Sequence, residues 1–246
     1  MNDTNFQTVK KNNKGENVVD VGSGYLSPIE YIDDLINQLK GDIFPLFEVS
    51  GYAPFTIARN TFCFIDHVSS LKYGTINQTG RIKRIISEFA SFDSYIQGKY
   101  KLYADYIVQV YRHDIVHNVR PFPHKIKVVE KNGSKQDKIS WFAVSSDIGN
   151  SLPKPETFEK LTVHFKVTKN RKGLCHLRYY GDNVVINNYC LFFDLVNFLL
   201  EYKHNLESDS NLQNEFVNNY QNIVEHYFEI KNFTLDKSKD KECKLI

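Results

Sequence analysis

Residues 111–121 mark the point where the chain changes from a helical to a strand-forming pattern. They read Tyr111-Arg112-His113-Asp114-Ile115-Val116-His117-Asn118-Val119-Arg120-Pro121. This stretch ends a long amphipathic segment and places two arginines, two histidines and a carboxylate within nine positions. Pro121 and Pro123 prevent the helix from continuing. A cluster this polar at the end of an apolar helix indicates either a chemical site or a structural ion-pair cluster.

Four segments up to residue 118 have the apolar spacing of helices, at about residues 28–40, 54–73, 80–96 and 99–118, and the last of them ends within this stretch. Ser27, Pro28 and Glu30 form the pattern of a capping box at the start of the first helix. The fourth helix has a continuous core stripe at Ala104, Val108, Tyr111 and Ile115. Its polar cluster is therefore expected at the edge of an apolar surface.

The pattern after Pro123 alternates as in strands, and it then returns to helix at about 188–205 and 209–229. The segments with strand character are 126–129, 139–144, 161–167, 174–180 and 184–186. The predicted fold class is α+β: a predominantly helical bundle of about six helices, with a small antiparallel sheet inserted between the fourth and fifth. Trp141, His164 and His176 are interpreted as residues packed within this sheet.

These patterns predict one main domain with two polar ends. Residues 1–24 are expected to be a flexible lead-in, residues 25–233 the helical domain with its β insertion at about 125–186, and residues 234–246 a charged tail.

Composition excludes several classes of protein. The chain has 246 residues, 41% of them hydrophobic, and a formal net charge of +2, so no overall basic field indicates nucleic-acid binding. The four cysteines have no paired spacing, which favours reduced thiols. No apolar run approaches the roughly 20 residues of a membrane span, and no signal segment is recognisable at the polar start. We therefore expect a cytoplasmic protein that does not enter the membrane.

Nucleotide-binding loops and the common hydrolase motifs are absent from the sequence. His113 and His117 are spaced i, i+4 and could share a metal ion. Asp114, however, falls on another side of the helix from His113, and Arg112 adds a repulsive charge. No metal or other cofactor is expected.

Arg112, the polar His113 and His117, followed by a helix break, resemble the motif of the HEPN superfamily of helical domains. Members of that superfamily often have an arginine and, four to six residues further on, a histidine near the end of a long helix. The resemblance covers about residues 28–121 and 187–229, and the sheet between them departs from the all-helical family pattern. Residues Arg171 to His176 match the same spacing, but they read as a hairpin turn that enters a strand.

The resemblance implies a metal-independent endoribonuclease, acting as a toxin or in antiviral defence, with an antitoxin or other partner protein. It also implies a homodimer in which two motifs converge on the RNA substrate. Arg112 and His117 would be catalytic, because arginine binds phosphate oxygens and histidine exchanges protons near neutral pH. The expected supporting or phosphate-binding residues are His113, Asp114, Asn118 and Arg120.

Two alternatives remain open. The domain could be HEPN-like without catalysis and bind nucleotide, RNA or a protein. It could instead be an unrelated helical protein in which Arg112, Asp114 and His117 form a structural ion-pair cluster. Arg59, Asp66 and His67 in the second helix are interpreted either as a solvated or ion-paired flank or as support for the Arg112 cluster.

Overall fold

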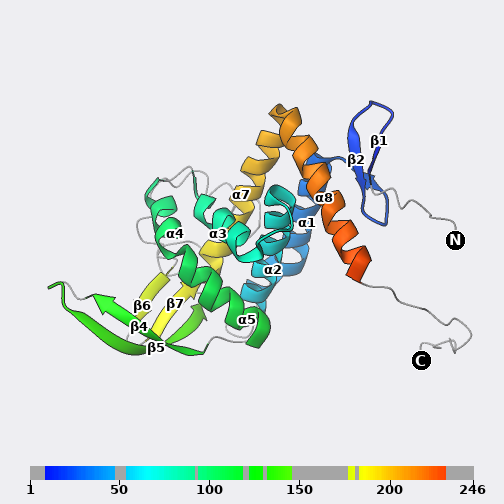
Figure 1. Ribbon diagram of the computed structural model, residues 1–246. Coiled ribbons are helices and arrows are strands. Elements are labelled where there is room, and N and C mark those ends of the chain that lie inside the picture. The colour runs from blue at the N-terminus through cyan, green and yellow to red at the C-terminus, as the bar shows by residue number, and fades with distance from the viewer. Residues whose placement is uncertain are drawn as a thin grey trace, which may run out of the picture.

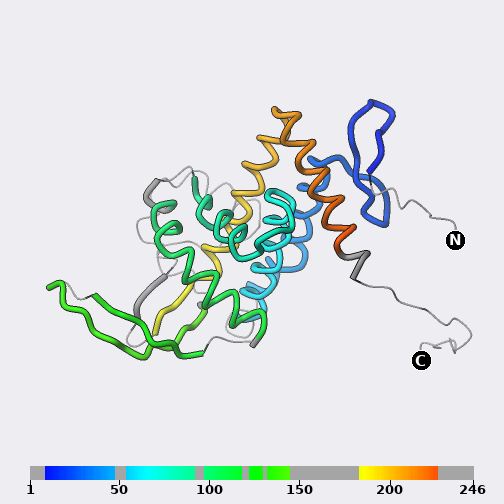
Figure 2. The backbone as a smooth tube through the Cα atoms, viewed as in Figure 1, coloured from blue at the N-terminus to red at the C-terminus, as the bar shows by residue number. Residues whose placement is uncertain are grey.

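The computed structural model describes residues 9–47, 54–91, 94–118, 122–129, 132–145, 177–180 and 183–230. Figure 2 follows the backbone through them. A helical body occupies the centre, with one small sheet near the N-terminus and another at the opposite end (Figure 1). This part of the chain confirms an α+β fold with a helical majority.

Helix α2 begins and ends where the sequence predicts. Helix α1 begins as predicted, but the chain stays helical past residue 40, as a π-helical turn at Leu39–Ile43 and a 3-10 turn at Phe44–Phe47. The helices of the described ranges are α1 (Pro28–Gln38), α2 (Pro54–Tyr73), α3 (Gln78–Glu88), α4 (Ser94–Tyr106), α5 (His113–Asn118), α7 (Asn188–Ser208) and α8 (Ser210–Ile230). Ser27 and Glu30 form the expected capping box, which satisfies backbone N–H groups at the start of α1.

The third predicted helix is shorter than expected. It ends at Glu88, because Phe89 takes an extended backbone and Ala90 a left-handed one (φ 55°). The predicted fourth helix is continuous, but a π-helical turn at Ile107–Arg112 separates α4 from α5. Its core stripe is buried as predicted, at Ala104, Val108, Tyr111 and Ile115.

Helix α7 is the central element of the core. Every residue from Asn188 to Leu199 is buried, which is the pattern of a helix surrounded by other elements. It contacts α1, α2 and α8, while α2 also contacts α3, α5 and α8. The residues that carry the polar cluster therefore stand on helices fixed by the core.

The N-terminal sheet differs from the expected flexible lead-in. It pairs β1 (Val9–Lys11), β2 (Asn17–Asp20) and β3 (Tyr25–Leu26) in antiparallel order. Val18 and Val19 are buried, and β2 contacts α1 and α8. The hydroxyl of Tyr220 donates to the carbonyl of Asp20 at 2.5 Å. Burial of this short apolar pair gives the polar segment a fixed place.

The second sheet has the strand order β4-β5-β7-β6. Its strands are β4 (Pro123–Val129), β5 (Lys135–Ser145), β6 (Leu177–Tyr180) and β7 (Asn183–Asn187). The prediction of an antiparallel sheet is right for β4–β5 and β6–β7 but wrong for β5–β7, which is parallel. The β6–β7 hairpin joins the sheet through its second strand. If β6 lay beside β5, the whole sheet would be antiparallel.

Helices cover one face of this sheet. Phe142 and Ile186 are buried, and the ring of Tyr111 packs edge-on against Phe142 at 5.3 Å between centroids. The hydroxyl of Tyr111 also donates to the carbonyl of Val184. The strand predicted at 161–167 and the tail predicted at 234–246 lie outside the described residues.

None of the helices in the described ranges combines the length and the apolar character that a membrane crossing requires.

Candidate functional site

Asp66 on α2 joins two arginines from different helices. Its Oδ2 lies 3.2 Å from Nη2 of Arg112, and its Oδ1 lies 2.8 Å from Nη2 of Arg81 on α3. Arg81 also donates to the hydroxyl of Ser69 and the carbonyl of Thr75. We call Asp66, Arg81 and Arg112 the Asp66 cluster. It links α2, α3 and the end of the π-helical turn.

The Asp66 cluster uses only some of the hydrogen-bond donors of Arg112. Its side chain is 12% exposed, and its Nε is buried without a hydrogen-bond partner among the described residues. Buried donors normally have an acceptor, so an unmatched one in a native site calls for an explanation. The guanidinium therefore keeps donor capacity beyond the pairing with Asp66.

His113 and His117 lie side by side on the exposed surface of α5. Their ring centroids are 4.9 Å apart, as expected for positions i and i+4. Both are exposed, whereas Arg112 turns toward α2. Within the described ranges, no group of three His, Cys, Asp or Glu side chains could hold a metal ion.

Asp114 is buried and belongs to the junction between α5 and β4. Its Oδ2 accepts the backbone N–H of Phe122 at 3.0 Å and lies 2.9 Å from Nε2 of His124. The His124 ring packs edge-on against Phe142. Asp114 thus orients an imidazole, but that imidazole belongs to His124 rather than to His117.

The other two predicted supporting residues are less fully placed. Asn118 is the last residue of α5, and only its backbone is described. Arg120 lies outside the described residues, as does the second motif match at Arg171 to His176.

Two of the three polar residues noted on α2 support the Arg112 region. Asp66 pairs with Arg112, and Nε of Arg59 donates to the carbonyl of Ile115 on α5 at 3.3 Å. His67 instead bonds to the hydroxyl of Tyr31 at 2.9 Å. Burial lowers the pKa of His67 below its ordinary value, although the nearby Asp66 carboxylate acts in the opposite direction.

Cys63 lies one helical turn from Asp66 and experiences the same charges. It is exposed, yet partial desolvation raises the pKa of its thiol, and the Asp66 carboxylate raises it further. Arg112 and Arg59 act in the opposite direction. The cysteine therefore reports on the charge balance around Arg112.

Sequence reasoning missed Arg81 as a partner of this region. Arg81, near the start of α3, is largely buried and shares Asp66 with Arg112. A signal was available, since a cation near the start of a helix opposes the helix dipole and needs a local reason. Trp141, interpreted as packed within the sheet, is instead 56% exposed.

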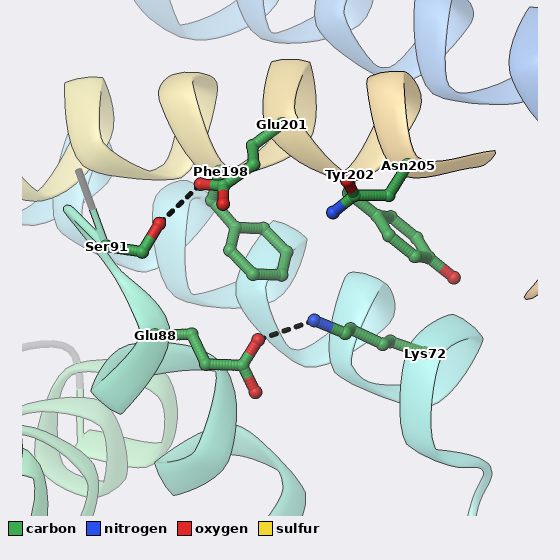
Figure 3. A pocket seen from close by; sticks show the side chains of 7 residues that line it. All are labelled: Lys72, Glu88, Ser91, Phe198, Glu201, Tyr202 and Asn205. Carbon is green, nitrogen blue, oxygen red and sulfur yellow. Dashed lines mark hydrogen bonds and ion pairs between the residues drawn. The ribbon is translucent and has the colours of Figure 1, made fainter. Parts of the chain in front are cut away.

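A pocket of about 130 Å³ lies elsewhere, among side chains of α2, α7 and the end of α3 (Figure 3). Lys72 pairs with Glu88 at 2.5 Å, and Ser91 donates to Glu201 at 2.5 Å. The ammonium of Lys72 also lies 4.9 Å from the ring centroid of Phe198. Each of the three charged side chains that line the pocket has a polar partner, which is the arrangement of a structural polar cluster.

Comparison of the chain with models of protein families, with curated proteins and with solved structures found no match.

Proposed function

We propose that this protein is a HEPN-like, metal-independent endoribonuclease whose active site is completed by a second copy of the chain. The observation that carries the proposal is the exposed pair His113 and His117 at the end of a core helix, directly after Arg112. Exposure matters because general acid–base groups must reach the substrate.

Each of the proposed residues has a role that the chemistry of RNA cleavage requires. A base removes the proton of the ribose 2′-hydroxyl, an acid protonates the leaving oxygen, and a cation stabilises the charge that develops on phosphorus. His117 supplies a proton-transfer group, and Arg112 supplies the cation. His113 lies close enough to contact the same phosphate.

A second copy completes this chemistry. One protomer offers one His117, but cleavage needs an acid and a base at the same time. Two motifs that meet at a twofold axis supply two copies of His117 and two of Arg112. A role as a toxin or in antiviral defence, with an antitoxin or other partner protein, belongs to the same proposal.

The first experiment measures RNA cleavage in excess EDTA. The parent protein is expected to cut RNA and to leave cyclic-phosphate ends, while His117→Ala and Arg112→Ala each reduce the rate by at least about 100-fold. Cleavage that stops with the chelator would contradict the proposal and favour a metal held by His113 and His117.

Arg81→Ala is the matched control, because Arg81 shares Asp66 with Arg112 but belongs to another helix. If Arg112 acts on RNA, Arg81→Ala keeps most of the cleavage rate, although it removes two further hydrogen bonds, to Ser69 and Thr75. If Arg81→Ala and Arg112→Ala lose cleavage equally, the Asp66 cluster supports cleavage only by stabilising the fold.

The Asp66 cluster itself favours a second candidate, a helical protein in which Arg112 is structural. Ion pairs that are largely removed from water cost roughly 3–5 kcal/mol when one partner is deleted, and exposed pairs cost about 1 kcal/mol or less. Under this candidate Arg112→Ala unfolds at lower denaturant concentration, and the parent protein does not cleave RNA. If the parent protein binds RNA without cleaving it, and the binding survives both His117→Ala and Arg112→Ala, the protein is instead a HEPN-like binding module.

A further inference from the structure

One face of the β4–β5 hairpin remains uncovered by the helices. Residues paired across the two strands point to the same side, and the partners on this side are Pro123 with Trp141, Lys125 with Ile139, Lys127 with Asp137, and Val129 with Lys135. We call these eight residues the β4–β5 outer face. In Figure 1 the hairpin extends beyond the helical body.

The outer face exposes large apolar side chains that a folded chain usually buries. Trp141 is 56% exposed, Ile139 71% and Val129 62%. On the opposite face, the end of β5 nearest the helices is packed, since Phe142 and Ser140 are buried against the protein. Apolar groups grouped on one exposed surface are typical of a binding site.

The same face has a positive charge balance. Lys125, Lys127 and Lys135 are exposed on it, against one carboxylate at Asp137. Asp137 neutralises one cation by pairing with Lys125 at 3.2 Å. An exposed tryptophan among surplus lysines combines a stacking surface for a base with cations for a phosphate backbone.

We propose that the β4–β5 outer face binds single-stranded RNA, with a base stacked on Trp141 and phosphates held by Lys125, Lys127 and Lys135. A duplex hides the faces of its bases, so stacking on an exposed ring selects unpaired strands. Lysines along β4, an edge strand of the described sheet, also oppose edge-to-edge pairing with a second copy.

The outer face is tied to the helix that carries the histidines. Asp114, next to His113, holds both Phe122 and His124, which flank Pro123 at the start of the outer face. A single-stranded RNA bound along β4 would therefore lie beside the end of α5. As a statement about substrate, this inference rests on the proposed function, because it names the RNA that His117 would cut.

Trp141 is the single tryptophan of the chain, so its fluorescence reports directly on the surface. The experiment titrates the full-length His117→Ala variant with a uridine-rich single-stranded RNA and with a duplex that contains the same strand. We expect the single strand to quench the fluorescence and to bind more tightly than the duplex.

Further variants in the His117→Ala background separate stacking from charge. Trp141→Ala is expected to weaken binding, measured with labelled RNA, by about 5- to 150-fold, while Trp141→Phe retains most of it. The double variant Lys125→Ala/Lys127→Ala lowers the salt dependence, with a slope smaller by about 0.7 per lysine. Tyr25→Ala and Lys11→Ala/Lys14→Ala are matched controls, because they change exposed residues of the N-terminal segment and should leave binding unchanged.

Binding that is insensitive to Trp141→Ala, or equal for the duplex, would overturn the outer face as an RNA surface. So would a change of oligomeric state in Trp141→Ala without loss of RNA affinity, which would assign the face to protein contact. Failure of the proposed function is distinguishable: a parent protein that never cleaves, yet binds single strands through Trp141, contradicts the nuclease and supports the surface.

Discussion

Deleting Asp66 should destabilise the candidate site more than deleting either of the arginines that it contacts. Deleting Arg81 or Arg112 leaves an ion pair in place, whereas deleting Asp66 leaves two cations near each other in a partly desolvated region. An unpaired charge in such a place is costly. Asp66 therefore sets how firmly Arg112 is held away from an approaching phosphate.

Cys63 allows this charge balance to be measured without any assumption about function. Asp66→Asn removes an anion that raises the pKa of the thiol, whereas Arg112→Ala removes a cation that lowers it. Because the thiolate is the reactive form, iodoacetamide should modify Cys63 several-fold faster in Asp66→Asn and slower in Arg112→Ala. Peptide mass spectrometry at pH 7.5 gives both rates.

The buried Cys190 is the control for this measurement, because it stays unmodified while the fold is intact. Rates at Cys63 that rise in both variants would contradict the electrostatic explanation and indicate local opening of α2.

His67 gives the protein a stability that depends on pH. Burial holds its folded-state pKa below the unfolded value of about 6.5, so the unfolded chain binds the additional proton first. The contribution of His67 to the free energy of unfolding should therefore be constant above about pH 6.5. Below that pH, the contribution should fall as the pH decreases. Urea unfolding at pH 7.5 and 5.5 measures the difference, which His67→Gln should reduce.

Tyr31→Phe distinguishes burial from hydrogen bonding as the cause. It removes the bond to His67 but leaves the ring buried, so the pH dependence should persist. A dependence that disappears in Tyr31→Phe would assign it to the hydrogen bond.

At the scale of elements, the helix α4–α5 shows what a pattern can and cannot predict. Its core stripe was predictable because Ala104, Val108, Tyr111 and Ile115 repeat at helical spacing and face one core. The π-helical turn within it was not, since a single widened turn leaves the apolar spacing nearly unchanged. Turns of this kind are frequent at functional sites, and this one ends at Arg112.

The strands β4, β5, β6 and β7 were predictable, but their order and their exposed face were not. Trp141 and Phe142 are adjacent and both apolar, so alternation alone does not decide which of them is buried. The structure buries Phe142 under Tyr111 and leaves Trp141 outside. Likewise, no local signal tells which strand of the β6–β7 hairpin will lie beside β5.

The junction between α5 and β4 depends on Asp114. Asp114→Ala leaves the N–H of Phe122 without its acceptor, so we expect the free energy of unfolding to fall by about 1–3 kcal/mol. Asp114→Asn keeps an acceptor and should lose less. Urea unfolding gives the stabilities, and hydrogen exchange at Phe122 should be faster in Asp114→Ala. A variant within about 0.5 kcal/mol of the parent would show that the junction is held by other contacts.

At the scale of the whole molecule, the residues of the candidate site were predicted more completely than their partners. The end of the fourth helix marked Arg112, His113 and His117 because polar groups concentrate there. Their partners come from elements far apart in sequence: Asp66 contacts Arg112 across 46 positions. Such a pairing depends on how helices pack, and a single sequence contains no record of that packing.

Under the proposed function, the acid and the base of the site come from two copies of the chain. Arg112 faces α2 and His117 faces outward, so a single protomer does not direct both side chains at one point. A second protomer that places its own histidine pair against the first would gather two His117 rings at one phosphate. The proposed nuclease therefore requires cooperation between two copies.

Mixing experiments test this requirement. Parent and His117→Ala proteins, unfolded together and refolded at equal amounts, form parent, mixed and variant dimers in a ratio of about 1:2:1 if they associate without preference. If cleavage needs both histidines, only parent dimers act, and activity falls to about one quarter of that of the same total amount of parent protein. Independent protomers would instead give about one half, because each parent chain would keep its own activity in any dimer. A measured value near one half would rule out the composite site while leaving each His117 catalytic, so the experiment separates the assembly from the chemistry.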